Sequence, residues 1–351
     1  MNDILRNPVI TSDLLTITTE YGLPWQRLKG QKVLITGASG FLAAYMVETL
    51  LFLNETQELG IQIFALVRSR RRFESRFAYA LGRQDLICIE QDVSEALAFS
   101  ARPDFIIHAA SQASPKYYST DPIGTLSANT LGTAALLKLA ALSGSKGFLF
   151  FSSGEVYGQT DIVPTAEQDL GFVDPTSVRA CYAESKRMGE NMCVSWHHQA
   201  SVPTTIVRPF HTYGPHMLLD DGRVYADFVA NILNNRPIIM KSDGKARRAF
   251  CYAADAVAGF WTVLLNGVHG QAYNVGNPMG ETSIGELAEM LVELYPEKKL
   301  SVVFAEREND GAYLVSPIVR NCPDITKVEK LGWHPRTSVR EGFKKTIESY
   351  I

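Results

Sequence analysis

The stretch Val33-Leu-Ile-Thr-Gly-Ala-Ser-Gly-Phe-Leu42 decides the fold of this 351-residue chain. It begins with a short apolar run that predicts a buried parallel strand. Gly37 and Gly40 follow, where a tight turn brings backbone N–H groups close to a ligand. From Phe41 onward, apolar residues recur at helical spacing. A strand, a glycine turn and a helix N-terminus together predict a pyrophosphate site, because free N–H groups and the positive end of the helix face the anion.

The pattern continues to a third small residue, Ala43, and reads G-x-x-G-x-x-A. Alanine suffices there because this residue only has to let the helix pack closely against the strand. We therefore expect a dinucleotide cofactor at this turn. Its contacts are expected from the turn and the first helical residues, namely Gly37, Ser39, Gly40, Phe41 and Leu42.

Composition and charge limit the class of protein. A hydrophobic fraction of 46% and a charged fraction of 20% fit a soluble globular protein. The net charge of −3 argues against nucleic acid as the main partner. The five cysteines are scattered and lack metal-ligand spacing, so they predict free thiols in a reducing cytoplasm and no metal site. We expect neither a membrane-spanning segment nor a secretion signal.

Apolar strands alternate with helices along most of the chain. Strands are expected at 33–35, 61–67, 86–90, 105–110, 147–151, 204–208 and 271–275. Helices are expected from 41, at 125–142, around 182–186 and at 284–294, the last opened by a capping box at 282–286. This alternation predicts an α/β fold with a doubly wound parallel sheet of the Rossmann type.

The order of these elements also predicts the domains. Residues 1–30 are expected to form an N-terminal arm packed on the surface. Residues 31–208 are expected to form the dinucleotide-binding domain, with a return segment near 240–275. Residues 209–239 and 276–351 are expected to form a smaller, discontinuous C-terminal domain that closes a substrate cleft over the carboxyl edge of the sheet.

The ends of three further strands are expected to line the cofactor site. Arg68 ends the second strand, where an acidic residue would bind the ribose 2′-hydroxyl and select NAD. An arginine at this position accommodates the 2′-phosphate of NADP, so NADP stays open beside NAD; the alternative is a solvated basic loop. Asp92 and Val93 are placed to meet the adenine, and Ala109 and Ala110 allow close approach of the backbone.

Tyr182 and Lys186 predict the chemistry. They lie four residues apart on one helical face, so both can point into the same cleft. A nearby ammonium group favours the phenolate and should lower the pKa of Tyr182 from its ordinary value near 10. Ser153 ends the fifth strand and can bind a substrate hydroxyl that Tyr182 deprotonates while a hydride passes to the nicotinamide. Asn129, inside an apolar helix, is expected to hydrogen-bond a specific partner.

With these residues in place, residues 30–350 resemble the extended short-chain dehydrogenase/reductase family, in particular its nucleotide-sugar epimerases, dehydratases and decarboxylases. The resemblance is closest to the UDP-glucuronate decarboxylases. Four further stretches carry it, namely residues 114–133, 179–186, 214–223 and 248–255.

The resemblance implies a role for each matching residue. Ser153 would bind the sugar hydroxyl, Tyr182 would be the base, Lys186 its partner, and Glu155 an acid/base or water-positioning residue near sugar carbon 5. Tyr182 and Lys186 would also contact the cofactor. The residues implied to bind substrate are Ser114, Asn129, Arg179, Arg223, Arg248 and Arg320, of which Arg223 and Arg248 would hold the diphosphate. A bound NAD, a UDP-sugar substrate, a homodimer and a role in polysaccharide biosynthesis are also implied.

Three positions depart from the decarboxylase pattern. Arg68 replaces the acidic residue after the second strand. Gly154 leaves Glu155 without one neighbouring side chain, while Ser153 conserves the hydroxyl. Arg320 lies one residue further from the Pro-Asp pair than in the pattern. Because that arginine would contact the substrate carboxylate, its displacement bears on the choice of substrate.

These departures leave the reaction open. Decarboxylation would oxidise carbon 4, release carbon dioxide, protonate carbon 5 and return the hydride to carbon 4. A 4-epimerase would return the hydride to the opposite face and has no need for Glu155, whereas many 4,6-dehydratases carry an aspartate at the position of Gly154. A non-catalytic, cofactor-sensing regulatory protein is the alternative of another class.

Overall fold

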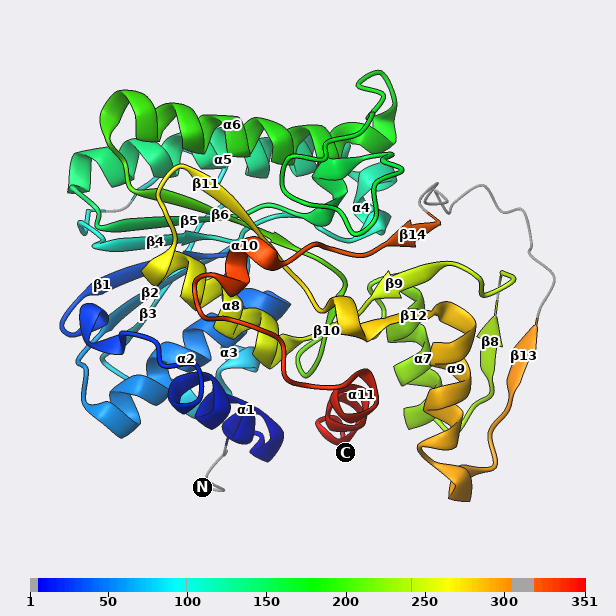
Figure 1. Cartoon of the computed structure of the whole chain (residues 1–351). Helices are drawn as coiled ribbons and strands as arrows, with labels where there is room; N and C mark the ends of the chain where they lie inside the picture. The colour runs from blue at the N-terminus through cyan, green and yellow to red at the C-terminus, as the bar shows by residue number, and fades with distance from the viewer. Residues whose placement is uncertain (1–5, 99, 241, 305–318) are drawn as a thin grey trace.

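A seven-stranded parallel sheet forms the centre of the molecule, in the order β11-β6-β5-β4-β1-β2-β3 (Figure 1). The structure, a computed structural model, describes residues 6–98, 100–240, 242–304 and 319–351. The strands are β1 (Lys32–Thr36), β2 (Gln62–Val67), β3 (Leu86–Glu90), β4 (Phe105–His108), β5 (Gly147–Phe151), β6 (Thr204–Pro209) and β11 (Gln271–Val275). All seven expected strands are present, and the predicted Rossmann-type fold is confirmed.

Helices cover both faces of this sheet because its strands are apolar on both sides. Along β1, Val33 and Ile35 enter one hydrophobic core while Leu34 enters the other. Figure 1 shows α5 (Pro122–Ser143) and α6 (Cys181–Ala200) on one face. The other face carries α2 (Phe41–Gln57), α3 (Arg70–Arg76) and α8 (Ala253–Asn266).

The order of the strands places the ligand site. The chain leaves β1 toward β2 on one side, and β4 adds on the other side of β1. In an open parallel sheet, the crevice at such a reversal, outside the carboxyl ends of the strands, is where ligands bind. The glycine turn after β1 lies at this point.

The N-terminal segment is more deeply packed than a surface arm. Its helix α1 (Pro8–Thr19) packs on α2 and α8, and it buries Ile10, Leu14 and Ile17 in the larger core. Asp13 on the same helix is also buried.

A smaller group of elements lies beyond the carboxyl edge of the sheet. It includes α4 (Pro115–Thr120), β7 (Thr212–Tyr213), α7 (Val224–Leu233), β8 (Ile238–Met240), β9 (Arg247–Ala249), β10 (Cys251–Tyr252), β12 (Glu281–Ser283), α9 (Ile284–Glu293), β13 (Val302–Phe304), β14 (Arg320–Asn321) and α11 (Val339–Glu348). The short helix α10 (Thr326–Glu329) instead packs on β11 of the main sheet. The expected capping box of α9 is present between Ser283 and Glu286. Of the segment 240–275, β11 belongs to the main sheet and α8 packs on that sheet, whereas β9 pairs with β12 and β14. The domain boundaries stay a prediction.

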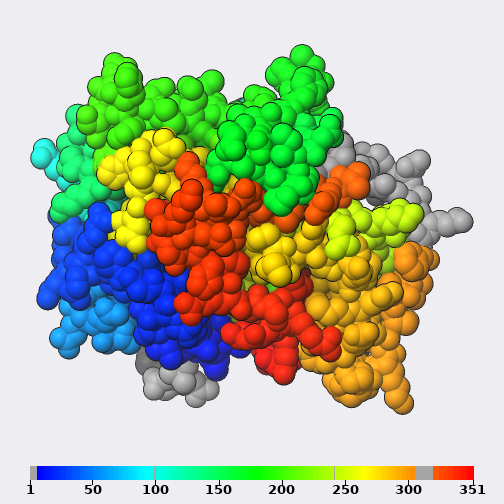
Figure 2. All heavy atoms as spheres, in the orientation of Figure 1, coloured from blue at the N-terminus to red at the C-terminus, as the bar shows by residue number. Residues whose placement is uncertain are grey.

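The C-terminal residues join the two groups of elements. Figure 2 shows them, in red, across the middle of one face, between the N-terminal residues and the residues before 304. Phe343 of α11 stacks on Tyr213, with ring centroids 3.8 Å apart. Within the described residues, no helix combines the length and the apolar character that crossing a bilayer requires.

Candidate active site

A large cavity runs along the carboxyl edge of the sheet. It has a volume of about 1990 Å³, and its walls come from the glycine turn, the ends of β2 to β5, the start of α6, and residues around α7 and β9. Pockets for one small ligand typically measure about 300–1,000 Å³. The cavity is therefore large enough for a dinucleotide and a second ligand side by side.

The glycine turn fits the pyrophosphate of a dinucleotide. Gly37 has φ +65°, and a Cβ there would lie 2.8 Å from the Cα of Ala110, so no other residue fits. Gly40 is the N-cap of α2 and offers no side chain to its first N–H groups. Phe41 and Leu42, the first residues of α2, line the cavity, so the unpaired N–H groups of this helix start are next to it.

The other residues expected at the cofactor line the same cavity. They are Ser39, Arg68, Asp92, Val93, Ala109 and Ala110. The Oδ1 atom of Asp92 accepts hydrogen bonds from the backbone and the hydroxyl of Ser94, at 2.9 and 2.7 Å. Their common position shows that the chain brings the ends of β2, β3 and β4 to one half of the cavity.

The expected catalytic residues come together in the other half. Tyr182 lies in the first turn of α6 and Lys186 one turn later, and both line the cavity. Ser153 follows β5, and its hydroxyl lies close enough to Tyr182 to lower the pKa of that phenol. The Ser153 oxygen also accepts from the backbone N–H of Glu155 at 3.2 Å, which fixes the short helical turn Gly154–Tyr157. Three elements thus converge on one hydroxyl-binding point.

Burial governs the electrostatics of this pair. It raises the pKa of Tyr182 to about 12, against the lowering effects of Ser153 and Arg223. It also lowers the pKa of Lys186 to about 7. The Nζ atom of Lys186 donates to the carbonyl of Phe151 at 2.6 Å and lies 5.7 Å from the centre of the Tyr182 ring. The expectation of a lowered pKa for Tyr182 is wrong in this structure, because loss of water outweighs the neighbouring cations.

Charged residues lie around Tyr182 and Lys186, the expected catalytic pair. Glu155 and Arg179 both line the cavity, with Oε2 and Nη1 3.6 Å apart. Arg223 lies 3.4 Å from Asp221; burial lowers its pKa, but Asp221 and several nearby tyrosines more than offset this and raise it above the ordinary value. Arg248 and Ser114 also line the cavity. The cavity thus contains a carboxylate, and it also contains guanidinium groups of the kind that bind phosphate.

Two residues expected to bind substrate do not reach the cavity. Asn129 is fully buried and donates to the hydroxyl of Ser185 at 3.0 Å, so its specific partner lies inside the protein. Arg320 forms a double ion pair with Glu281, at 2.6 and 2.9 Å, and is absent from the cavity lining. Both are corrections to the sequence interpretation. Asn129 lies on the buried face of its helix, and Arg320 lies one residue before Asn321, which is the residue that lines the cavity.

Other residues line the cavity without having been expected there. Among them are Tyr118, Arg71, Arg72, Arg76 and Asn321. Tyr118 stacks on Tyr182, with centroids 5.0 Å apart and planes at 19°, and so restrains the plane of the Tyr182 ring. Its place four residues after Ser114, in one of the stretches that carry the resemblance, was the available signal. For Asn321, the available signal was its distance from the Pro323-Asp324 pair, because at this distance the decarboxylase pattern has its arginine.

The sequence profile of the NAD dependent epimerase/dehydratase family matches residues 33–276, which is more than half of the chain. The chain belongs to this family. The match begins at the strand before the glycine turn and ends with β11, so it spans the whole central sheet.

Curated relatives agree with this placement. The chain is similar to UDP-glucuronic acid decarboxylase 5 of Arabidopsis thaliana, with 35% identity over 91% of the chain and 89% of the relative. It is similar to UDP-glucuronic acid decarboxylase 1 of Xenopus tropicalis, with 33% identity over 91% of the chain and 72% of the relative. The expected class, an enzyme that modifies nucleotide sugars with a nicotinamide cofactor, is confirmed.

Solved structures share the fold. The epimerase Mth375 of Methanothermobacter thermautotrophicus superposes with a TM-score of 0.80 at 24% identity, covering 95% of each chain. DesIV, a dTDP-glucose 4,6-dehydratase of Streptomyces venezuelae solved with NAD bound, gives a TM-score of 0.77 at 24% identity, covering 91% of this chain and 96% of its own. At this identity the likeness shows the fold alone.

Proposed function

We propose that the protein decarboxylates UDP-glucuronate through transient oxidation at sugar carbon 4. The observation that carries the proposal is the convergence of Ser153, Tyr182 and Glu155 on one wall of a cavity that also holds the glycine turn. The relatedness to UDP-glucuronic acid decarboxylases supports the choice of substrate.

The proton steps follow from the pair on α6. Ser153 orients the carbon 4 hydroxyl and Tyr182 takes its proton, with Lys186 as the buried ammonium that stabilises the phenolate. The nicotinamide cofactor, when bound, accepts the hydride from carbon 4 and later returns it. The ketone at carbon 4 lets the bond between carbons 5 and 6 break, carbon dioxide leaves, and the electron pair forms an enolate.

Glu155 is proposed to serve the protonation of carbon 5, directly or through a water molecule. Its Oε2 atom lies 3.6 Å from Nη1 of Arg179, so this ion pair positions the carboxyl group in the cavity. Once carbon 5 is protonated, return of the hydride and of the Tyr182 proton restores the carbon 4 alcohol. The net change is loss of carbon dioxide and uptake of one proton, with no net oxidation.

Arg223 and Arg248 are proposed to bind the diphosphate. Both residues line the cavity and belong to the smaller group of elements. Arg223 is held by Asp221 and by the carbonyl of Ala113, and Arg248 by the carbonyls of Arg247 and Val319. Such anchoring presents a fixed fork of donors to phosphate oxygens.

Mass spectrometry of the reaction tests this proposal. The purified protein is incubated separately with UDP-glucuronate, UDP-glucose and dTDP-glucose, each with NAD or NADP. Loss of 44 mass units from UDP-glucuronate, as expected for carbon dioxide (~44 Da), is the predicted result. Loss of water from a neutral sugar or an epimer of unchanged mass would refute decarboxylation, and no turnover of any sugar would favour the regulatory alternative.

One observation favours a second candidate, a 4-epimerase or 4,6-dehydratase acting on an uncharged sugar. Asn321, and not an arginine, reaches the cavity at the position expected to read the substrate carboxylate. Its Oδ1 atom is buried without a hydrogen-bond partner among the described residues, so it is suited to a sugar hydroxyl. The three-substrate experiment separates this candidate from the first.

We also propose a cytoplasmic homodimer formed through α5 and α6. These neighbouring helices expose large apolar side chains, among them Ile123 at 75% and Leu142 at 70%. Exposed apolar faces of this kind favour association. Light scattering after gel filtration is expected to give twice the chain mass of 38.8 kDa, and a monomer would refute the dimer.

A further inference from the structure

The turn between β2 and α3 is strongly basic and faces the cofactor half of the cavity. It reads Arg68-Ser-Arg-Arg-Arg72. Arg68, Ser69, Arg71 and Arg72 line the cavity, on the same side as Gly37 and Asp92. The strand end where a carboxylate would select the ribose 2′-hydroxyl therefore carries a guanidinium group.

Three of these arginines have no counter-ion in contact. Arg68, Arg71 and Arg72 form no hydrogen bond or ion pair through their side chains with the parts of the chain that the structure describes. Arg70 differs: its backbone and side chain both meet Glu90, at 2.8 and 3.8 Å, and it is absent from the cavity lining. Glu90, the last residue of β3, is thus paired with Arg70, which does not line the cavity.

Two other carboxylates are close enough to feel Arg68 but are already engaged. The charge of Arg68 helps to lower the pKa of Asp92 and of Asp121. Asp92 is bound by Ser94, while Asp121 accepts from Gln112 at 2.7 Å and from the backbone of Gly124 at 3.0 Å. Neither acid forms an ion pair with Arg68, so the guanidinium remains available to a ligand.

We propose that this protein binds NADP in preference to NAD, with Arg68 and the neighbouring Arg71 and Arg72 holding the 2′-phosphate. A guanidinium group matches phosphate oxygens in geometry and charge, and several unpaired ones suit a dianion better than a neutral hydroxyl. The family is named for its dependence on NAD, so a preference for NADP would distinguish this chain from the cofactor in the family's name. The inference rests on the proposed function only in requiring a dinucleotide in the cavity.

Calorimetric binding to the full-length protein tests the inference without turnover. The probes are NADP⁺, NAD⁺, and the fragments adenosine 2′,5′-bisphosphate and 5′-AMP. We expect NADP⁺ to bind at least about tenfold more tightly than NAD⁺, and the bisphosphate more tightly than 5′-AMP. Raising the salt concentration should weaken NADP⁺ binding more than NAD⁺ binding, because the additional contacts are ionic.

Two matched variants locate the effect. Arg68→Ala should weaken NADP⁺ binding about tenfold or more and change NAD⁺ binding less than about threefold. Arg70→Ala, which removes a cation from the same turn but outside the cavity, should change neither. Both side chains are exposed, so both variants are expected to fold, and circular dichroism checks this.

The possible failures are distinguishable. Equal or tighter binding of NAD⁺, or equal losses for both dinucleotides in Arg68→Ala, would overturn the 2′-phosphate site and leave the proposed function standing. Tight NADP⁺ binding without turnover of any sugar would overturn the proposed function alone. Failure of both dinucleotides to bind would overturn both.

Discussion

At the scale of single residues, the site depends on a few atoms whose surroundings decide what they do. Tyr182 is an ordinary phenol until α6 buries it beside Ser153 and against the ring of Tyr118. Its pKa of about 12 makes the phenolate scarce at neutral pH, so the proposed base depends on its neighbours and on the bound cofactor. Lys186, with a pKa lowered to about 7, is the neighbouring group whose own protonation most readily changes near neutral pH, so it is suited to stabilise the phenolate or to transfer a proton.

Replacing Tyr182 by phenylalanine isolates this one hydroxyl. Tyr182→Phe should lower kcat by about 10² to 10⁴-fold, because the proton carrier is removed, while dinucleotide binding changes little. Steady-state kinetics measures kcat, and calorimetry measures dinucleotide binding. Tyr295→Phe, which removes the same atom outside the cavity, is the control and should retain full activity. Full activity of Tyr182→Phe would refute the mechanism.

Two glycines of the site differ in whether the structure requires them. Gly37→Ala should weaken dinucleotide binding by at least about tenfold, because its φ of +65° is unfavourable for alanine and the new Cβ would meet Ala110 at 2.8 Å. At Gly154, a Cβ would meet only the ring of Phe210 at 3.4 Å, an ordinary contact. Gly154→Ala should therefore fold and bind dinucleotide normally. Equal losses in the two variants would contradict this distinction.

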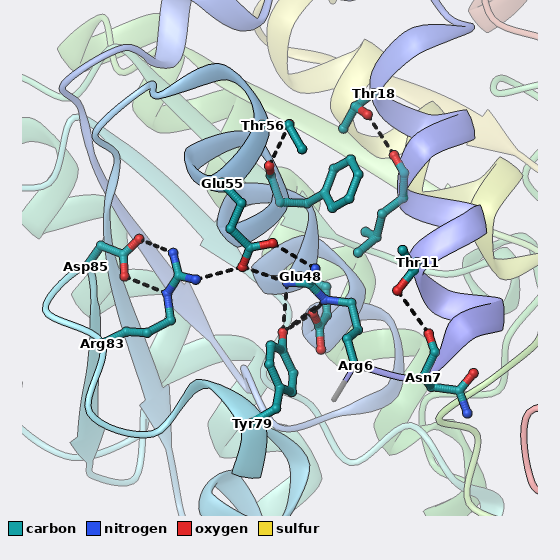
Figure 3. A network of polar contacts seen from close by, with 12 residues as sticks. Arg6, Asn7, Thr11, Thr18, Glu48, Glu55, Thr56, Tyr79, Arg83 and Asp85 are labelled. Atoms are coloured by element: carbon teal, nitrogen blue, oxygen red, sulfur yellow. Dashed lines mark hydrogen bonds and ion pairs between the residues drawn. The ribbon is translucent and has the colours of Figure 1, made fainter. Parts of the chain in front are cut away.

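At the scale of elements, ion pairs fix the start of the chain onto α2 (Figure 3). Arg6 contacts Glu48 through Nε at 2.8 Å and Glu55 through both terminal nitrogens, at 2.9 and 3.1 Å. Glu48 is only 1% exposed, and burial raises its pKa despite the nearby arginine. The hydroxyl of Tyr79 bonds the same carboxylate. The helix that carries the glycine turn is thus braced from outside by a residue far away in sequence.

Arg6→Ala should lower the free energy of unfolding by roughly 3 kcal/mol, because it leaves the Glu48 carboxylate buried and unpaired. Urea denaturation measures the loss. Arg83→Ala removes the other arginine of the network, whose partners Glu55 and Asp85 are about one third exposed or less, and should cost about 1 kcal/mol. Adding Glu48→Gln to Arg6→Ala should recover stability, and no recovery would refute the unpaired charge as the cause.

At the scale of the whole molecule, one buried carboxylate joins the two ends of the chain. Asp13 on α1 accepts hydrogen bonds from Tyr45 of α2 at 2.9 Å and from Tyr252 of β10 at 2.7 Å. Lys345 of α11 lies 3.7 Å away. Burial raises the pKa of Asp13 to about 6, and the hydrogen bonds and Lys345 only partly oppose this. The N-terminal helix, the cofactor helix and the C-terminal helix therefore meet at a titratable group.

The sign of its pH dependence follows from the raised pKa. The folded state holds this proton more tightly than the unfolded state, so Asp13 lowers stability as pH rises from about 4 to 6 and has no further effect above. Relative to Asp13→Asn, the wild-type protein should lose up to about 3 kcal/mol of unfolding free energy across this range. Denaturation of both proteins at pH 4, 5, 6 and 7 measures the difference, and a constant difference would contradict the assignment.

The central sheet was predictable from the sequence because each strand signals itself locally. The run 147–151 is apolar throughout and the run 61–67 is apolar except for Gln62, as expected of strands covered on both faces. The short strands beyond the sheet were not predicted. β9, for example, has three residues, and its partners β12 and β14 lie more than 30 residues further along the chain. Such pairings depend on contacts that no local pattern encodes.

The sequence by itself determined the glycine turn, the helix that follows it and the catalytic spacing of Tyr182 and Lys186, because backbone conformation and helical periodicity act over a few residues. Only the tertiary structure decided that Asn129 bonds Ser185, that Arg320 pairs with Glu281 while Asn321 faces the cavity, and that burial raises the pKa of Tyr182. Those outcomes depend on partners distant in sequence and on the exclusion of water, and both arise only when the elements pack together.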